Sequence, residues 1–184
     1  MVSLTTPPGQ PGFAAPDFDL PGVDGRSHTL ASARGPHGLL VMFICNHCPY
    51  VKAVLGRIVR DTDALRPLGI GSIAIMSNDP AEYAEDSFEN MQAVAQRQRF
   101  GFPYVLDATQ AVAQSYGAVC TPDFFGFDRD LKLVYRGRLD ASGRSGIADA
   151  PRELFDAMRE VAAGRAAPPV QHPSIGCSIK WKRR

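Results

Sequence analysis

Residues 39–51 read LLVMFICNHCPYV, an apolar run that leads into two cysteines three positions apart, Cys45 and Cys48. The run over residues 39–45 has the length and composition of a strand that is buried on both faces. Beyond Cys48, apolar residues recur every three or four positions as far as residue 65, which is typical of an amphipathic helix. This stretch predicts a buried strand that passes directly into a helix, with both thiols at the junction.

Strands and helices continue to alternate on either side of this stretch. A second apolar run over residues 70–77 predicts another buried strand. Asp79, Pro80 and Glu82 have the pattern of a helix start, so a helix is expected from there to about residue 100. Further strands are expected over residues 102–107, 123–128 and 132–140, and further helices over residues 108–117 and 149–164. The pattern predicts the α/β class, with a mixed central sheet flanked by helices.

The length and charge of the chain limit its organisation and partners. It has 184 residues and a formal net charge of +1, which favours one globular domain and neither nucleic acid nor a membrane as a partner. We expect a flexible arm over residues 1–15, the domain over residues 16–164, and a tail over residues 165–184 that packs back on it. No segment resembles an export signal. We therefore expect a cytoplasmic, reducing environment, in which paired cysteines are more often catalytic or metal-binding than structural.

The position of Cys45 and Cys48 predicts thiol redox chemistry. Unpaired N–H groups at a helix N-terminus stabilise a thiolate, and a second thiol three positions away can resolve a mixed disulfide formed on the first. We expect Cys45 to attack with a lowered pKa and Cys48, shielded by its own helix, to resolve. His47, if protonated, would favour the thiolate; the alternative is that His47 is an exposed surface residue.

Three segments carry a resemblance to a known family. LLVMFICNHCPYV and APDFDLPGVDGRSHTL (residues 15–30) resemble the thioredoxin superfamily, in its peroxiredoxin-like branch, the AhpC/TSA family. YGAVCTPDFFGFD (residues 116–128) resembles the segment that carries the cis-proline of that superfamily, with Thr121-Pro122 at the matching place. SIGCSIKW (residues 174–181) resembles the C-terminal signature of a peroxiredoxin-like group with the same CNHCPYV.

The resemblance implies a thioredoxin-like fold with an N-terminal β-hairpin of peroxiredoxin type. It also implies a cis peptide bond before Pro122, and a substrate polypeptide strand that pairs with the backbone of Thr121. The expected function is that of a thiol-disulfide oxidoreductase. Its partners would be protein or small-molecule disulfides and a cellular thiol reductant.

The sequence departs from the peroxidase motif P-x-x-x-T-x-x-C of this family. If Cys48 were peroxidatic, Val41 and Cys45 would stand in the proline and threonine places. If Cys45 were peroxidatic, Gly38 and Met42 would stand there. An antioxidant thiol peroxidase is therefore kept as an alternative function. Relative to thioredoxin, Asn46-His47 replaces Gly-Pro between the cysteines; the histidine matches disulfide oxidases and isomerases and favours a more oxidising pair.

The remaining cysteines leave two further alternatives open. Cys120 directly precedes the expected cis-proline loop, and Cys177 lies in the tail, so each is either an inert buried thiol or an accessory thiol in a relay. All four cysteines, with His47 or His172, could instead form a zinc site in a non-catalytic module. Because Cys120 and Cys177 are isolated in the sequence, we expect no metal and no cofactor. The acidic residues over 79–89 are attributed to a helix N-terminus, and the sequence identifies no buried carboxylate.

Overall fold

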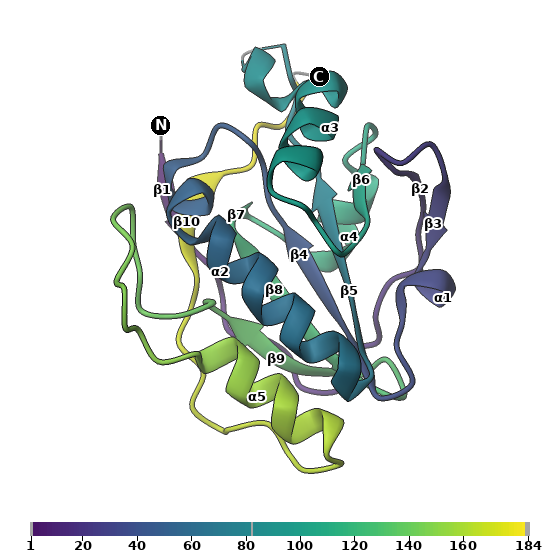
Figure 1. Cartoon of the computed structure of the whole chain (residues 1–184), viewed down its shortest axis with the longest axis vertical. Coiled ribbons are helices and arrows are strands. Elements are labelled where there is room, and N and C mark those ends of the chain that lie inside the picture. The colour runs from purple at the N-terminus through teal and green to yellow at the C-terminus, as the bar shows by residue number, and fades with distance from the viewer. Residues whose placement is uncertain (1, 82, 183–184) are drawn as a thin grey trace.

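The computed structural model describes residues 2–81 and 83–182, and its centre is a five-stranded mixed sheet (Figure 1). Strand β4 (Gly38–Phe43) is the middle strand, and the order is β6-β5-β4-β8-β9. On one side β4 pairs in parallel with β5 (Ile70–Met76), which pairs in parallel with β6 (Tyr104–Leu106). On the other side it pairs antiparallel with β8 (Asp123–Asp128), which pairs antiparallel with β9 (Leu133–Gly137). The predicted mixed sheet is confirmed.

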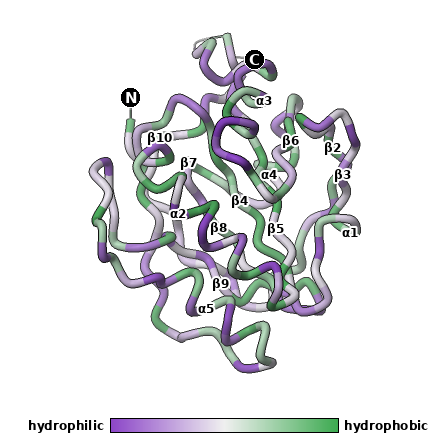
Figure 2. The backbone as a smooth tube through the Cα atoms, viewed as in Figure 1, coloured by the Kyte–Doolittle hydropathy of each residue, from purple (hydrophilic) through white to green (hydrophobic). Residues whose placement is uncertain are grey.

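Helices cover both faces of this sheet. Successive side chains of β4 point to opposite faces, and each set packs against a different group of helices. Leu40 and Met42 lie in a core cluster with apolar residues of α2 (Pro49–Leu65), α3 (Phe88–Arg97) and α5 (Glu153–Ala162). Leu39 and Val41 lie in a second cluster with residues of α1 (Leu30–Ala33) and α4 (Ala111–Tyr116). Figure 2 shows the hydrophobic colour concentrated along β4 and β5, as expected for strands that are buried on both faces.

Two small sheets complete the fold. Strands β2 (Asp19–Pro21) and β3 (Ser27–Thr29) form the N-terminal hairpin that the resemblance implies. Strands β1 (Ser3–Thr5), β10 (Ile175–Ser178) and β7 (Cys120–Thr121) form a second sheet in the order β1-β10-β7. The first and the last strands of the chain therefore lie side by side, and residues 3–5 are held in a strand, in contrast to the flexible arm expected over residues 1–15.

The segment between β5 and α3 differs from the predicted helix. It forms a loop and a short 3-10 helix, η2 (Ala84–Asp86), and α3 begins only at Phe88, with Ser87 as its N-cap. Asp79 instead accepts a hydrogen bond from the backbone N–H of Ala81 within a turn. Glu82 lies outside the described residues. A second 3-10 helix, η1 (Arg66–Leu68), follows α2. No helix within the described ranges is both long enough and apolar enough to cross a membrane.

Candidate active site

The two thiols of the CNHC segment lie in the connection between β4 and α2. Cys45 lies in the loop two residues after β4 ends, whereas α2 begins at Pro49 and has Cys48 as its N-cap. The expectation that both thiols lie at the junction of a strand and a helix is confirmed, and Pro49, which takes the first helical position, leaves Cys48 just outside the helix. Both side chains are buried, with 2% of Cys45 and 0% of Cys48 exposed.

Cys48 is the more acidic thiol of the pair. Hydrogen bonds to its sulfur from the Cys45 thiol, then from the Cys177 side chain and from backbone groups that include Val51, outweigh its burial and lower its pKa to about 5. Val51 is the third residue of α2, so its N–H is one of the unpaired donors at the helix N-terminus. In its neutral form, Cys48 donates to the carbonyl oxygen of Thr121, 3.1 Å away. The site therefore stabilises a thiolate on Cys48.

Cys45 has the opposite tendency. Burial raises its pKa well above the usual value, and the hydrogen bond to Cys48 and the negative charge of Asp86 add to this effect. Its sulfur lies 3.2 Å from Oγ1 of Thr121, a contact that works in the other direction. The prediction of a lowered pKa for Cys45 is therefore wrong, because burial and the hydrogen bond to Cys48 raise it and the charge of Asp86 adds to them.

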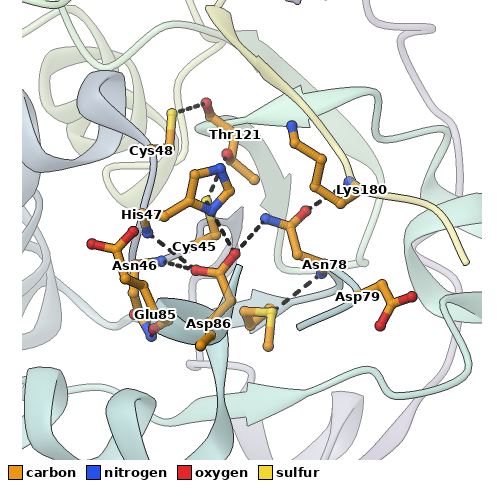
Figure 3. A network of polar contacts seen from close by, with 12 residues as sticks. Cys45, Asn46, His47, Cys48, Asn78, Asp79, Glu85, Asp86, Thr121 and Lys180 are labelled. Atoms are coloured by element: carbon orange, nitrogen blue, oxygen red, sulfur yellow. Dashed lines mark hydrogen bonds and ion pairs between the residues drawn. The ribbon is translucent and has the colours of Figure 1, made fainter. Parts of the chain in front are cut away.

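That carboxylate, Asp86, is the group that the sequence did not reveal. It is fully buried and accepts four hydrogen bonds (Figure 3): from the backbone N–H groups of Asn46 at 2.8 Å and His47 at 3.1 Å, from Nδ1 of His47 at 2.6 Å, and from Nδ2 of Asn78 at 2.9 Å. Burial raises the pKa of Asp86, but the hydrogen bonds from His47 and Asn78 outweigh it and hold the pKa below its usual value. The acidic run at 79–89 was the available signal. Only the loop conformation turns one of its members inward.

His47 is enclosed between this carboxylate and an aromatic ring. Its side chain is almost fully buried, Tyr83 stacks on it with ring centroids 4.0 Å apart, and its Nδ1 lies 3.7 Å from the sulfur of Cys45. The alternative that His47 is an exposed surface residue is therefore wrong. Its Nδ1 contacts Cys45 and Asp86, and its Nε2 has no hydrogen-bond partner among the described residues.

Three potential metal ligands meet at this point. Ligand atoms of Cys45, His47 and Asp86 lie within 4.8 Å of one another and belong to buried residues. This set differs from the four-cysteine site considered from the sequence, and His172 lies elsewhere, 3.2 Å from Glu153. A metal would have to replace the short contact between His47 and Asp86, which a proton fills without any rearrangement. The contacts present fit an acid–base pair beside a thiol.

The cis-proline loop lies directly across from the two thiols. The peptide bond between Thr121 and Pro122 is cis, as the resemblance implies. The backbone of Thr121, expected to pair with a substrate strand, pairs in this structure with Cys177 of the chain's own β10. Cys120 is buried, lies 3.8 Å from the carbonyl oxygen of Pro122, and has a pKa raised mainly by burial. Thr121 thus contacts the thiols of both Cys45 and Cys48, and Cys177 hydrogen-bonds to the sulfur of Cys48.

A cavity of about 250 Å³ reaches the site between α2 and α3. Its lining residues include Cys45, Asn46, Lys52 and Arg97. Cys48 is not part of this lining. Of the two thiols, it is therefore Cys45 that borders this cavity.

The pKa of Cys48 predicts an unusual pH dependence of alkylation. Because its pKa is about 5, Cys48 is already ionised at neutral pH, and its labelling by iodoacetamide should change little between about pH 6.5 and 8.5. An ordinary thiol with a pKa near 8.5 reacts about tenfold faster for each pH unit over most of that range. The rate is measured by peptide mapping of the reduced protein. In Cys45→Ala, which lacks the main hydrogen-bond donor, the midpoint should move upward. A tenfold rise per unit at Cys48 of the unchanged protein would contradict the assignment.

Comparison with known proteins identifies relatives of this chain. The crystal structure of an uncharacterized conserved protein from Geobacillus kaustophilus is 45% identical, covers 100% of this chain and 98% of that chain, and has a TM-score of 0.95. The thiol-disulfide oxidoreductase ResA of Geobacillus thermodenitrificans (strain NG80-2) is 26% identical over 122 residues, which are 66% of this chain and 66% of ResA.

The fold and the family follow from two further matches. A thioredoxin domain of a thiol-disulfide oxidoreductase from Bacteroides vulgatus, 20% identical, matches 70% of this chain and 89% of its own with a TM-score of 0.58, which shows a thioredoxin-like fold. The family model described as AhpC/TSA family matches residues 11–136, well over half of the chain. The protein therefore belongs to the AhpC/TSA family.

Proposed function

We propose that this chain is a thiol-disulfide oxidoreductase in which Cys48 attacks a disulfide and Cys45 resolves the product. The observation that carries the proposal is the position of Cys48, an acidic thiol at the N-terminus of α2 that is hydrogen-bonded to the thiol of Cys45. The roles of the two cysteines are reversed relative to those expected from the sequence. The similarity to ResA supports this reaction class.

The reaction needs two thiol–disulfide exchanges. The Cys48 thiolate attacks one sulfur of the substrate disulfide in line with the S–S bond, so that a mixed disulfide forms and the other sulfur leaves as a thiolate. Cys45 then loses its proton and attacks the Cys48 sulfur, which releases the second substrate thiolate and leaves a Cys45–Cys48 disulfide. The Nδ1–H of His47, which is held by Asp86 and lies 3.7 Å from the Cys45 sulfur, is positioned to stabilise the Cys45 thiolate as it forms, and the Cys45 proton passes to solvent.

A thiol reductant must restore the dithiol after each turnover. The cavity between α2 and α3 touches Cys45, so a small thiol would reach the Cys45–Cys48 disulfide from that side. The proposed substrates are protein or small-molecule disulfides, and the proposed location is the cytoplasm, where such reductants are available.

Catalysed disulfide reduction tests this function directly. With dithiothreitol as the electron donor, the protein should accelerate the reduction of insulin, followed as turbidity, and of oxidised glutathione, followed by thiol release. The double variant Cys45→Ser/Cys48→Ser should leave only the uncatalysed rate, and Cys120→Ser, which alters a buried thiol outside the pair, should keep the catalysed rate. Equal rates for the unchanged protein and the double variant on both substrates would rule the proposal out.

A further inference from the structure

The C-terminal strand β10 places a third thiol against the proposed nucleophile. The side chain and the backbone of Cys177 both hydrogen-bond to the sulfur of Cys48. Cys177 is fully buried, and its strand lies between β1 and β7, in register with Thr121 beside the cis-proline. Cys48 therefore has two thiol neighbours: Cys45 in its own loop and Cys177 in a strand more than a hundred residues further along the chain.

Close contacts on both sides of Cys177 hold strand β10 against strand β7. Gly176 faces the carbonyl of Thr121 so closely that a side-chain carbon at position 176 would overlap the oxygen. Beyond the strand, the backbone of Lys180 binds the Asn78 side chain at 2.9 Å and the N–H of Asp79 at 2.8 Å. Asn78 in turn donates to Asp86, so the tail is tied to the hydrogen-bond network that holds His47 (Figure 3).

This arrangement occupies the edge at which a substrate strand was expected to pair. The antiparallel pairing of Thr121 with Cys177 places a cysteine of the chain itself at this edge, beside the cis-proline. Resting on the proposed function, we propose that Cys177 is a second resolving thiol, which attacks the mixed disulfide on Cys48 from the strand β10.

The exchange is balanced in atoms and electrons. In the mixed disulfide, Cys48 is bonded to a substrate sulfur; the Cys177 sulfur attacks Cys48, the bond to the substrate breaks, and a Cys48–Cys177 disulfide forms. The substrate sulfur leaves with the electron pair and takes up the proton that Cys177 loses. The product disulfide has the same oxidation state as Cys45–Cys48, so the two can interconvert by one further exchange.

The charges around Cys177 favour its attack after Cys48 has formed the mixed disulfide, and not before. Burial and the neighbouring Cys48 raise the pKa of Cys177 to about 12, whereas the positive charges of Lys180 and Arg144 lower it. Once Cys48 is in a mixed disulfide, its negative charge is gone and its effect on Cys177 disappears. Cys177 is thus held as a neutral thiol while Cys48 is the nucleophile, and it ionises more readily when Cys48 needs to be resolved.

Trapping of the mixed disulfide tests the proposal. Reduced Cys45→Ser protein is treated with 5,5′-dithiobis(2-nitrobenzoate), and the adduct on Cys48 is followed by intact mass and by disulfide mapping. We expect the adduct to be lost and a Cys48–Cys177 disulfide to replace it. In Cys45→Ser/Cys177→Ser the adduct should persist on the order of a hundredfold longer, because the internal thiol acts at a high effective concentration. The matched control Cys45→Ser/Cys120→Ser should lose it at the original rate.

A displaced strand gives an independent readout. Gly176→Ala in the Cys45→Ser background should push β10 from Thr121 and slow the loss of the adduct by about a hundredfold, without slowing its formation. Gly56→Ala, at a site in α2 where an added methyl meets no neighbour, is the control and should change neither step.

The outcomes separate this inference from the proposed function. An adduct on Cys48 that is equally stable with and without Cys177 would overturn the role of Cys177 and leave Cys48 as the nucleophile. A Cys48 that forms no adduct in any variant would overturn both.

Discussion

Cys48→Ser is expected to lower the rate of disulfide reduction on the order of a thousandfold or more, because a serine hydroxyl stays protonated at neutral pH and cannot replace the thiolate. Cys45→Ser should have a different effect. It should slow repeated turnover, since one resolving thiol is lost, but keep the first attack within about tenfold, because the nucleophile and the N-terminus of α2 are intact.

A single-turnover experiment separates these two effects. Each reduced variant is mixed with an excess of a chromogenic disulfide, and the first equivalent of released thiol is followed by stopped flow. The unchanged protein and Cys45→Ser should both show a burst that maps to Cys48, and Cys48→Ser should show none. A burst that survives in Cys48→Ser and disappears in Cys45→Ser would return the attacking role to Cys45, as the sequence alone suggested.

Asp86→Ala is expected to lower the free energy of unfolding by about 3–5 kcal/mol, because each buried donor that is left without an acceptor costs about 1–3 kcal/mol. Its carboxylate accepts hydrogen bonds from two backbone N–H groups of the loop and from the side chains of His47 and Asn78. All four donors would lose this acceptor. For a chain of this size that corresponds to a fall in Tm of about 6–20 °C. The measurement is thermal unfolding of the reduced protein by circular dichroism.

Two variants define what the Asp86 experiment measures. Glu85→Ala, next to it in the chain, removes an exposed carboxylate whose ion pair with Lys52 spans 3.4 Å, and should change the stability by less than about 0.5 kcal/mol. Asp86→Asn keeps an acceptor oxygen for the backbone and should fall between the two. A Tm for Asp86→Ala close to that of Glu85→Ala would show that the loop does not depend on the carboxylate.

The contribution of Asp86 should also depend on pH in a defined direction. Its pKa in the folded protein lies below the usual value of 3.8, so the folded state binds fewer protons near that value than the unfolded state. The stability that it supplies is therefore present above about pH 4 and is lost as the pH falls through the folded pKa. The stability difference between the unchanged protein and Asp86→Ala should accordingly shrink in acid.

The sequence by itself was sufficient for the central sheet and for the position of the thiols between a strand and a helix. The reason is that these features are local: the apolar run of β4 and the periodicity of α2 each lie within fewer than twenty residues. Even the correct start of α2 was available, since a proline favours the first helical position and so marks Cys48 as the N-cap. What the sequence did not show is which groups hydrogen-bond to each thiol, and for that reason the expectation of a lowered pKa for Cys45 was wrong.

The tertiary structure decided which groups surround the thiols. Asp86 reaches His47 across 39 positions of the chain, and nothing in its neighbourhood distinguishes it from the exposed Glu85 except the turn that buries it. Strand β10 has only four residues and no useful periodicity, and it forms because Gly176 lets its backbone approach Thr121. Pairing between segments so distant depends on the whole fold. The sequence therefore determined that a thiol pair exists, and the tertiary structure decided which cysteine is acidic and which thiols face it.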